Sequence, residues 1–294
     1  MTNTNVSLSH LRVLNTAIEK GSFSAAAEEI GITQSGVSQS IKHLEATLGA
    51  QLLIRHRDGV APTELGKAVL ADARLALQAI ERIRQACSAA KGVPSGRIRL
   101  GSISSVAARM LPSILARFRR QYPGVKIDLI EGTETEIGEW VENAVVDLGL
   151  TGETTPNVLA SPVAEDDFVL VVGAKHRLAG RRFIRPADIA QESFLMSTSG
   201  CEPAIRRIFG AANINPPIAF RVRDPEALVN MVGQGLGVTI MPQLSIPDRV
   251  RGVVCVSIQP RQERRIVAIT SSDQPEMPAV EILKVMLMRG KNAG

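Results

Sequence analysis

Residues 21–48 read GSFSAAAEEIGITQSGVSQSIKHLEATL, and this stretch decides the fold of the amino-terminal part of the chain. In its second half, apolar residues recur at steps of four and three, which predicts a helix with one face buried in a core. These apolar residues are Val37, Ile41, Leu44 and Leu48. The opposite face carries Gln34, Ser35, Ser38, Gln39 and Lys42. Such side chains hydrogen-bond base edges and phosphates when a helix lies in a major groove, although an ordinary solvated helix face has the same composition.

The residues before this helix predict a partner helix and a tight turn. A helix over Ser24–Ile30 would bury small alanines, which allow two helices to cross closely. Gly31 suits the left-handed conformation that ends a helix. Thr33 is placed to cap the next helix through its hydroxyl. Together these features predict a helix-turn-helix.

The flanking sequence extends this unit on both sides. Leu8–Glu19 is expected to form a first helix that covers the other two. Asp58-Gly59 is a hairpin turn signal between two short strands, as in the wing of a winged helix. Arg55 and Arg57 would then contact the DNA backbone or the minor groove; the alternative is that they are ordinary surface arginines.

A long helix of about 28 residues is expected to begin at Thr63-Glu64, directly after Pro62. One stripe of small and apolar residues, spaced by alternating threes and fours, approximates a coiled-coil seam. The stripe consists of Leu65, Val69, Ala73, Ala76, Ile80, Ile83, Cys87 and Ala90. A helix of this length with a narrow stripe needs a partner, and a second copy of the chain is the simplest one.

The segment Gly92-Val93-Pro94-Ser95-Gly96 interrupts the helical pattern, and strands and helices alternate after it. This order predicts a mostly parallel sheet covered by helices, built as two successive units. The expected strands are 97–101, 125–130, 147–150, 168–172, 237–241 and 266–270. The expected helices are 104–122, 134–145, 203–209, 225–233 and 280–288, the last packing back on the first unit.

Composition and motifs exclude several classes of protein. The chain has 294 residues, 45% of them hydrophobic, and a formal net charge of +5, so folded domains are expected and total charge alone would not hold DNA. Three cysteines without a CxxC pair predict neither disulfides nor a zinc site. There is no secretory leader and no apolar run of the ~20 residues that span a bilayer, so a soluble cytoplasmic protein is expected. No GxSxG, P-loop or HExxH motif occurs, so no enzyme, metal or cofactor is expected.

Nearly the whole chain resembles the LysR-type transcriptional regulators. The segments FSAAAEEIGITQSGVSQSIKHLEATLGAQLLIR, PTELG, RIRLGSIS, LPSILARFRRQYPGV, DLGL, KHRLAG and GQGLGVTIMP stand in the order of that family. The resemblance implies a winged helix-turn-helix over residues 1–63, a dimerising linker helix over 64–91 and a periplasmic-binding-protein-like α/β effector domain over 92–294. The effector domain would comprise subdomain I (92–162 and 265–294) and subdomain II (163–264). It also implies homodimers or homotetramers on interrupted inverted repeats in double-stranded DNA.

The resemblance further implies which residues contact DNA. The positions that match the recognition helix and wing are Thr33, Gln34, Ser35, Ser38, Gln39, Lys42 and Arg55. Leu53 stands where the family usually has phenylalanine, and Gly36 where alanine is commoner. Glycine weakens a helix by ~1 kcal/mol but allows a closer approach.

A small-molecule effector is expected between the two subdomains, at the ends of strands and the starts of helices. The candidate residues are Ser102, Ser104, Ser105, Gly132, Thr133, Ser199, Gly200 and Cys201. Hydroxyls and helix N-termini suit a small carboxylate, although caps and turns use the same residues. Glu202 would compete with such an anion or meet an amino group, so an amino-acid-like ligand stays open. Cys201 is either structural or, with a pKa lowered at a helix start, a redox sensor.

These observations favour a ligand-responsive DNA-binding regulator of transcription. The rival hypothesis is a two-lobed small-molecule binding protein or enzyme in which the amino-terminal helices only mediate association. A steep loss of duplex affinity with salt, together with a preference for one promoter, would distinguish the regulator from the rival.

Overall fold

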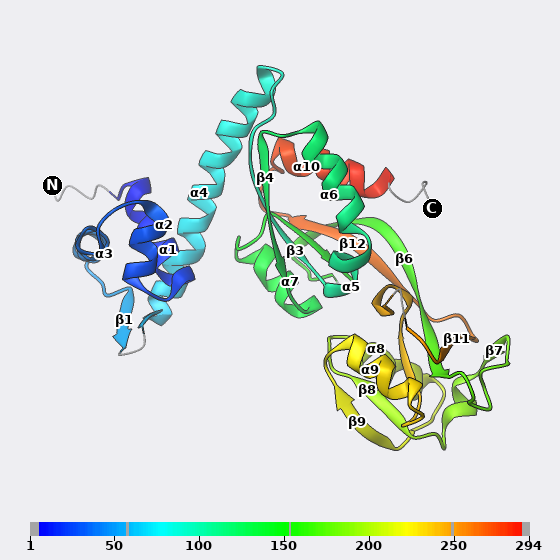
Figure 1. Ribbon diagram of the computed structural model, residues 1–294. Coiled ribbons are helices and arrows are strands. Elements are labelled where there is room, and N and C mark those ends of the chain that lie inside the picture. Colours follow the sequence, from blue (N-terminus) through cyan, green and yellow to red (C-terminus); the bar gives the residue numbers. More distant parts are fainter. Residues whose placement is uncertain (1–5, 57–58, 153, 248–249, 290–294) are drawn as a thin grey trace.

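The computed structural model describes residues 6–56, 59–152, 154–247 and 250–289. Figure 1 shows three parts along the chain: a small helical unit, the long helix α4, and two lobes joined by extended strands. Among the described residues, no helix is long and apolar enough to cross a membrane.

The helical unit contains α1 (Leu8–Lys20), α2 (Phe23–Ile30) and α3 (Gln34–Leu48). Gly31 ends α2 with φ of 79°, and the Thr33 hydroxyl accepts a hydrogen bond from the Gly36 N–H at 3.1 Å at the start of α3. The predicted turn chemistry is therefore confirmed. Val37, Ile41 and Leu44 are buried as expected, but Leu48 is 42% exposed, because it lies in the last turn, beyond the core beneath the helix.

The wing is an antiparallel pair of strands, β1 (Leu53–His56) and β2 (Gly59–Pro62). Both its strands are held to the helices: the Leu52 and Leu53 N–H groups donate to the Glu45 carboxylate, and Val60 N–H donates to the Gly21 carbonyl. Arg57, which we expected to contact DNA, lies outside the described residues.

Helix α4 (Glu64–Ala90) has 27 residues and starts at a Thr63 cap, as the sequence predicts. The small and apolar residues of its stripe do not share one environment. Ala73 is buried within the chain, whereas Leu65, Ile83 and Cys87 are exposed in the single chain. The buried polar residues of α4 were not expected, and they are described with the site below.

Lobe I surrounds one apolar cluster, to which the carboxyl-terminal helix α10 (Pro278–Arg289) returns, as predicted. Its remaining elements are β3 (Gly96–Ser102), α5 (Ser104–Arg109), α6 (Leu111–Gln121), β4 (Val125–Glu131), α7 (Glu134–Glu142) and β5 (Leu148–Thr151). The single helix expected over Ser104–Tyr122 is wrong: it divides at Met110, because Pro112 has no N–H for the helical ladder and its ring clashes with the carbonyl four residues earlier. Helix α7 also ends before the predicted Val145.

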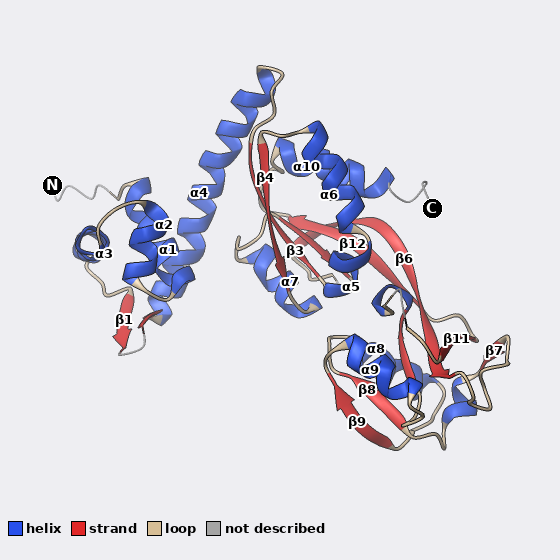
Figure 2. Ribbon diagram, in the orientation of Figure 1, coloured by secondary structure: helices blue, strands red, loops and turns tan. Residues whose placement is uncertain are grey.

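Lobe II has two apolar clusters on either side of its strands. Its elements are β7 (Phe183–Ile184), β8 (Phe194–Ser197), α8 (Glu202–Ala211), β9 (Ile218–Val222), α9 (Pro225–Gly233), β10 (Thr239–Pro242) and β11 (Val253–Ile258), with short 3-10 helices at 186–189 and 243–245. Strands β8 and β9 pair with each other in parallel, and Val238, just before β10, bridges β8 to the main sheet. Figure 2 shows α8 and α9 beside them.

Two long strands join the lobes, β6 (Val158–Gly173) outward and β12 (Glu263–Ser271) back. Within the described residues, eight strands form one sheet in the order β4-β3-β5-β12-β6-β11-β7, with β10 also paired to β6. The expectation of a mostly parallel sheet is confirmed for β4, β3 and β5, and the pairs β7–β11 and β8–β9 are parallel too. It is wrong for the middle of the sheet: the chain crosses and returns, so β12 runs antiparallel to both β5 and β6, and β6 runs antiparallel to β10 and β11.

Candidate nucleic-acid interface and ligand cleft

The polar face of α3 is turned to solvent. Apart from half-buried Ser38, the predicted DNA-facing side chains on and just before this helix are exposed; they are Thr33, Gln34, Ser35, Gln39 and Lys42. The buried Val37, Ile41 and Leu44 hold the opposite face on α1 and α2. This arrangement leaves amide, hydroxyl and ammonium groups available to a partner.

Arg55 of the wing is positioned by two contacts with the helical unit. Its Nη2 donates to the Ser38 hydroxyl at 3.1 Å, and its guanidinium carbon lies 4.5 Å from the centre of the Phe23 ring. A cation over an aromatic face is attracted by about 0.5–1 kcal/mol at an exposed site. The wing cation is therefore held beside α3 before any ligand binds, which the sequence did not indicate.

Two histidines lie where α1 meets α3. The His10 and His43 ring centres are 4.9 Å apart, and the His10 Nδ1 atom is buried with no hydrogen-bond partner among the described residues. Burial, and then the neighbouring His43, lower the pKa of His10. The neutral form of His10 is thus favoured in the folded unit.

The predicted effector residues of lobe I are mostly engaged in local bonds. Ser102 is fully buried, and its hydroxyl donates to the Ile103 carbonyl. Thr133 caps α7 in a reciprocal pair with Glu136: its hydroxyl accepts from the Glu136 N–H at 3.3 Å and donates to the carboxylate at 2.8 Å. The N–H and hydroxyl of Thr133 lower the pKa of Glu136. Gly132 packs against Trp140, and Ser104 is exposed at the start of α5.

The predicted residues of lobe II lie in the loop before α8. The Ser197 and Ser199 hydroxyls are 2.9 Å apart, and Gly200 has φ of 107°, a conformation that side chains disfavour. Burial raises the pKa of the Cys201 thiol, so the lowered pKa expected at a helix start is wrong. Desolvation of a thiolate here outweighs the hydrogen bond from Ser197 and the positive charge of Arg264.

Glu202 is already paired, so it does not present a lone carboxylate to a ligand. Arg221 Nη1 lies 2.9 and 3.1 Å from its two oxygens, and Arg206 Nη2 lies 2.6 Å away. Hydrogen bonds from Arg221 and then Arg206 lower the pKa of Glu202. The sequence suggested that the Glu202 carboxylate would compete with an anionic ligand. In the structure, the guanidinium groups of Arg221 and Arg206 neutralise this carboxylate.

Arg264, which the sequence analysis did not single out, joins both lobes at the crossing strands. Its guanidinium donates to the Asp166 carboxylate at 2.8 and 3.0 Å and to the Ser105 hydroxyl at 2.7 Å, and it lies 3.7 Å from Glu134. The Arg264 and Asp166 side chains are only 13% and 1% exposed. Their signal in the sequence was two short charged runs, 165–167 and 263–265, each directly followed by an apolar strand pattern.

Electrostatic influence extends from this group to the opposite lobe. The positive charge of Arg264 lowers the pKa of Cys201, and the negative charge of Glu134 raises it. Each of these two effects is smaller than the effect of burial. Arg223, before α9, likewise has a small lowering effect on the pKa of Glu136. The starts of α5, α7 and α8 therefore lie near Arg264; whether a ligand binds among them stays a prediction.

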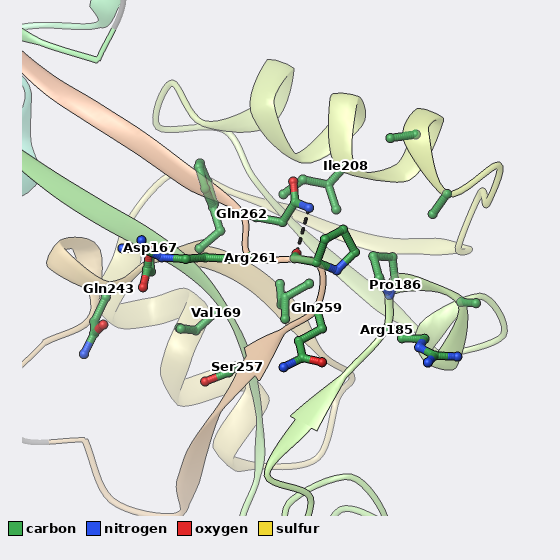
Figure 3. Close-up of a pocket in the computed structure, with 16 residues that line it drawn as sticks. Asp167, Val169, Arg185, Pro186, Ile208, Gln243, Ser257, Gln259, Arg261 and Gln262 are labelled. Carbon is green, nitrogen blue, oxygen red and sulfur yellow. Dashed lines mark hydrogen bonds and ion pairs between the residues drawn. The ribbon is translucent and has the colours of Figure 1, made fainter.

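Two further pockets lie beside the crossing strands. One, of about 470 Å³, is lined by residues of both lobes, including Arg109, Asp166 and Leu244. The other, of about 820 Å³, lies on lobe II (Figure 3). None of the predicted effector residues lines either pocket. In the described part of the chain, no group of three or more His, Cys, Asp or Glu side chains is arranged to hold a metal ion.

Helix α4 is tied to lobe I by buried amides. Gln85, 1% exposed, donates to the Arg97 carbonyl at 3.0 Å and accepts from the Ala279 N–H at 3.2 Å. Gln78 donates to Asp147 at 2.8 Å, and the same carboxylate binds Arg99. These contacts connect the linker helix to β3, to α10 and to Asp147 just before β5.

Comparison with known proteins agrees with this organisation. Residues 8–67 match the model described as "Bacterial regulatory helix-turn-helix protein, lysR family", and residues 91–289 match "LysR substrate binding domain". The chain is 30% identical over 276 residues to "Probable HTH-type transcriptional regulator LrrA" of Synechococcus elongatus, covering 94% of each chain.

Two solved structures extend the comparison. A full-length OxyR variant of Pseudomonas aeruginosa superposes with a TM-score of 0.78 at 20% identity, covering 97% of this chain and 98% of that one, which shows a shared fold. The effector binding domain of QuiR in complex with shikimate has a TM-score of 0.60 at 26% identity, covering 66% of this chain and 96% of that one.

Proposed function

We propose a mode of action that follows from one premise: the chain belongs to the LysR family of DNA-binding transcriptional regulators, with a helix-turn-helix and an effector-binding domain. It is a regulator of transcription and not an enzyme. What remains to be assigned is how it reads DNA, which chemistry it senses and how the two are coupled.

In this proposal, α3 lies in the major groove with its exposed face against the bases. Gln34, Ser35 and Gln39 read base edges, while Thr33 and Lys42 contact phosphates. Arg55, held between Ser38 and Phe23, places its charge along the adjacent backbone or minor groove, and Arg57, two positions later in the sequence, is proposed to contact DNA as well. The single observation that carries the proposal is the exposure of this polar face on a helix whose opposite face buries Val37, Ile41 and Leu44.

The effector is a small carboxylate, with an amino-acid-like carboxylate as the more specific candidate. The start of α5, with Ser104 and Ser105, and the loop with Ser199–Cys201 lie near Arg264, which would bind a carboxylate, and near Glu134, which would bind an ammonium group. That QuiR is solved with shikimate supports a small organic ligand in a related domain. Binding would exchange the Arg264–Ser105 hydrogen bond for contacts to the ligand, and so shift lobe closure.

Lobe closure would reach DNA through α4. Lobe I holds α4 through Gln78 and Gln85, so a change in lobe geometry changes the angle of α4. The exposed Leu65, Ile83 and Cys87 would meet a second copy, giving a dimer and, through the effector domains, a tetramer on an interrupted inverted repeat in DNA. We take 1–63, 64–91 and 92–294 as the domains, with subdomains of 92–162 plus 265–294 and 163–264.

The DNA half of the proposal is tested by fluorescence anisotropy with duplexes from the regulator's own promoter region. We expect Gln39→Ala to lower affinity for the preferred duplex about 5- to 150-fold, because a bidentate base contact is worth ~1–3 kcal/mol. Lys42→Ala should weaken all duplexes and reduce the salt slope by about one.

Matched controls are the exposed Gln191→Ala and Lys175→Ala of lobe II, which should leave binding unchanged. If Gln39→Ala bound the preferred duplex as tightly as Gln191→Ala, the proposed orientation of α3 would be abandoned.

The effector half is tested by the thermal midpoint of the full chain with a panel of carboxylates and amino acids. A compound that raises the midpoint should do so less in Ser105→Ala than in the control Ser113→Ala, whose serine is exposed on α6. An equal response of both variants would place the ligand elsewhere.

A further inference from the structure

We infer that the 820 Å³ pocket on lobe II is a second ligand site, separate from the proposed effector cleft, and that it takes a small monocarboxylate with an apolar, ring-sized body. It lies between the carboxyl-terminal half of α8, the 3-10 helix at 186–189 and the turn that joins β11 to β12. Its volume falls in the range of small-molecule sites, about 300–1,000 Å³.

The floor of the pocket is apolar and belongs to the core of lobe II. Phe168, Ile208 and Ile258 are members of the buried cluster and also line the pocket, with Pro186 beside them. Figure 3 shows Ile208 and Pro186 facing the same hollow from two different elements. Such a floor favours the burial of an apolar ligand body.

The rim is polar, and its side chains keep hydrogen-bonding groups that can contact a ligand. Ser257 and Gln259 line the pocket and are exposed, and Gln262 uses its Nε2 to bond the Pro260 carbonyl while its oxygen remains available. A few polar groups around an apolar floor are the usual means of orienting a small ligand.

Two arginines and one aspartate supply the charges of the rim. Arg261 is committed to carboxylates, with Asp167 at 2.8 Å and Glu263 at 3.0 Å. Arg185 is exposed and has no ion-pair partner among residues 6–56, 59–152, 154–247 and 250–289. Its guanidinium is therefore the uncommitted charge of the pocket, and its planar fork matches a carboxylate.

This pocket lies away from the proposed cleft but is lined by residues of, or next to, the same elements, namely α8 and the crossing strands β6 and β12. Cys201 stands at the start of α8, and Ala211 of the pocket at its end, a separation of about 15 Å for a helix of ten residues. Asp167 lies on crossing strand β6, and the Gln262 carbonyl accepts from the Phe168 N–H at 2.7 Å beside β12. A ligand here would bias how the lobes are joined without entering the cleft.

The test uses 4-fluorobenzoate and its neutral analogue 4-fluorobenzamide, with ¹⁹F NMR titration of the full-length protein. We expect saturable benzoate binding, with the benzamide at least tenfold weaker. Arg185→Gln should weaken benzoate at least tenfold and leave benzamide unchanged. Ala211→Trp, at an exposed position on the rim, should block both compounds. The matched control Arg182→Gln changes an exposed arginine that does not line the pocket, and should bind like the unmodified chain.

A second control separates this site from the proposed cleft. Ser199→Phe fills the cleft side of lobe II and should leave benzoate binding intact. Binding that is lost in Ser199→Phe but kept in Ala211→Trp would overturn the second site. Absence of saturable binding up to 10 mM would overturn it too, and equal binding of both compounds with no effect of Arg185→Gln would overturn the assignment of a carboxylate.

Discussion

At the residue scale, the reactivity of Cys201 depends on burial and not on its helix. The thiol stands before α8 but its pKa is raised, because the protein around it excludes the water that a thiolate needs. We expect iodoacetamide to label Cys201 at least tenfold more slowly in the folded chain than in the urea-unfolded chain at pH 7.5, with the difference narrowing as pH rises. Peptide mass spectrometry measures both rates. Labelling of Cys201 in the folded chain as fast as in the unfolded chain would restore the redox-sensor hypothesis.

The His10–His43 contact predicts a pH dependence of stability. The pKa of His10 is lowered in the folded state, so the unfolded chain binds more protons, and stability falls as pH drops through the unfolded value of about 6.5. The thermal midpoint should decrease from pH 7.5 to 5.5, and less so in His10→Gln. The exposed His56→Gln is the control. An identical pH response of His10→Gln and the unmodified chain would contradict this assignment.

At the scale of elements, the junction of α4 with lobe I depends on two buried amide side chains of α4. The sequence of this helix predicted only an apolar coiled-coil stripe. Gln85→Leu would leave the Arg97 carbonyl and the Ala279 N–H without their partner. An unpaired buried group costs ~1–3 kcal/mol, so urea denaturation should show a loss of that order.

The control for this prediction is Arg84→Leu, at an exposed position one residue away. If Gln85→Leu were as stable as Arg84→Leu, the amide would not hold the junction. A stable Gln85→Leu protein that no longer responds to its effector would instead assign the amide to signal transmission alone.

At the scale of the whole molecule, the exposed apolar residues of α4 predict self-association. Ile83 is 59% and Leu65 51% exposed, whereas Leu70 and Ala73 between them are buried within the chain. Ile83→Glu should shift sedimentation toward the monomer and lower DNA affinity by at least tenfold, because the two reading helices would no longer bind as a linked pair. The control Arg84→Glu adds the same side chain one position away and should change neither sedimentation nor DNA affinity in this way. A dimer that persists in Ile83→Glu would place the interface elsewhere.

The sequence by itself determined the helix-turn-helix, its caps, the length of α4 and most strands and helices of the lobes, because those features follow from local spacing and turn chemistry. It placed Thr33, Gln39 and Lys42 on one face for the same reason. Their roles, and those of the effector residues, stay predictions.

Only the tertiary structure decided the rest. The division of one expected helix at Met110, the antiparallel crossing of β6 and β12, and the meeting of Arg264 with Asp166 and Ser105 each depend on segments far apart in the chain. The raised pKa of Cys201 and the burial of Gln85 are likewise set by what packs against them. The spacing of apolar residues indicates which side of a helix or strand is buried. It does not indicate which distant charge or carbonyl group that side will contact, or how far water will be excluded from it.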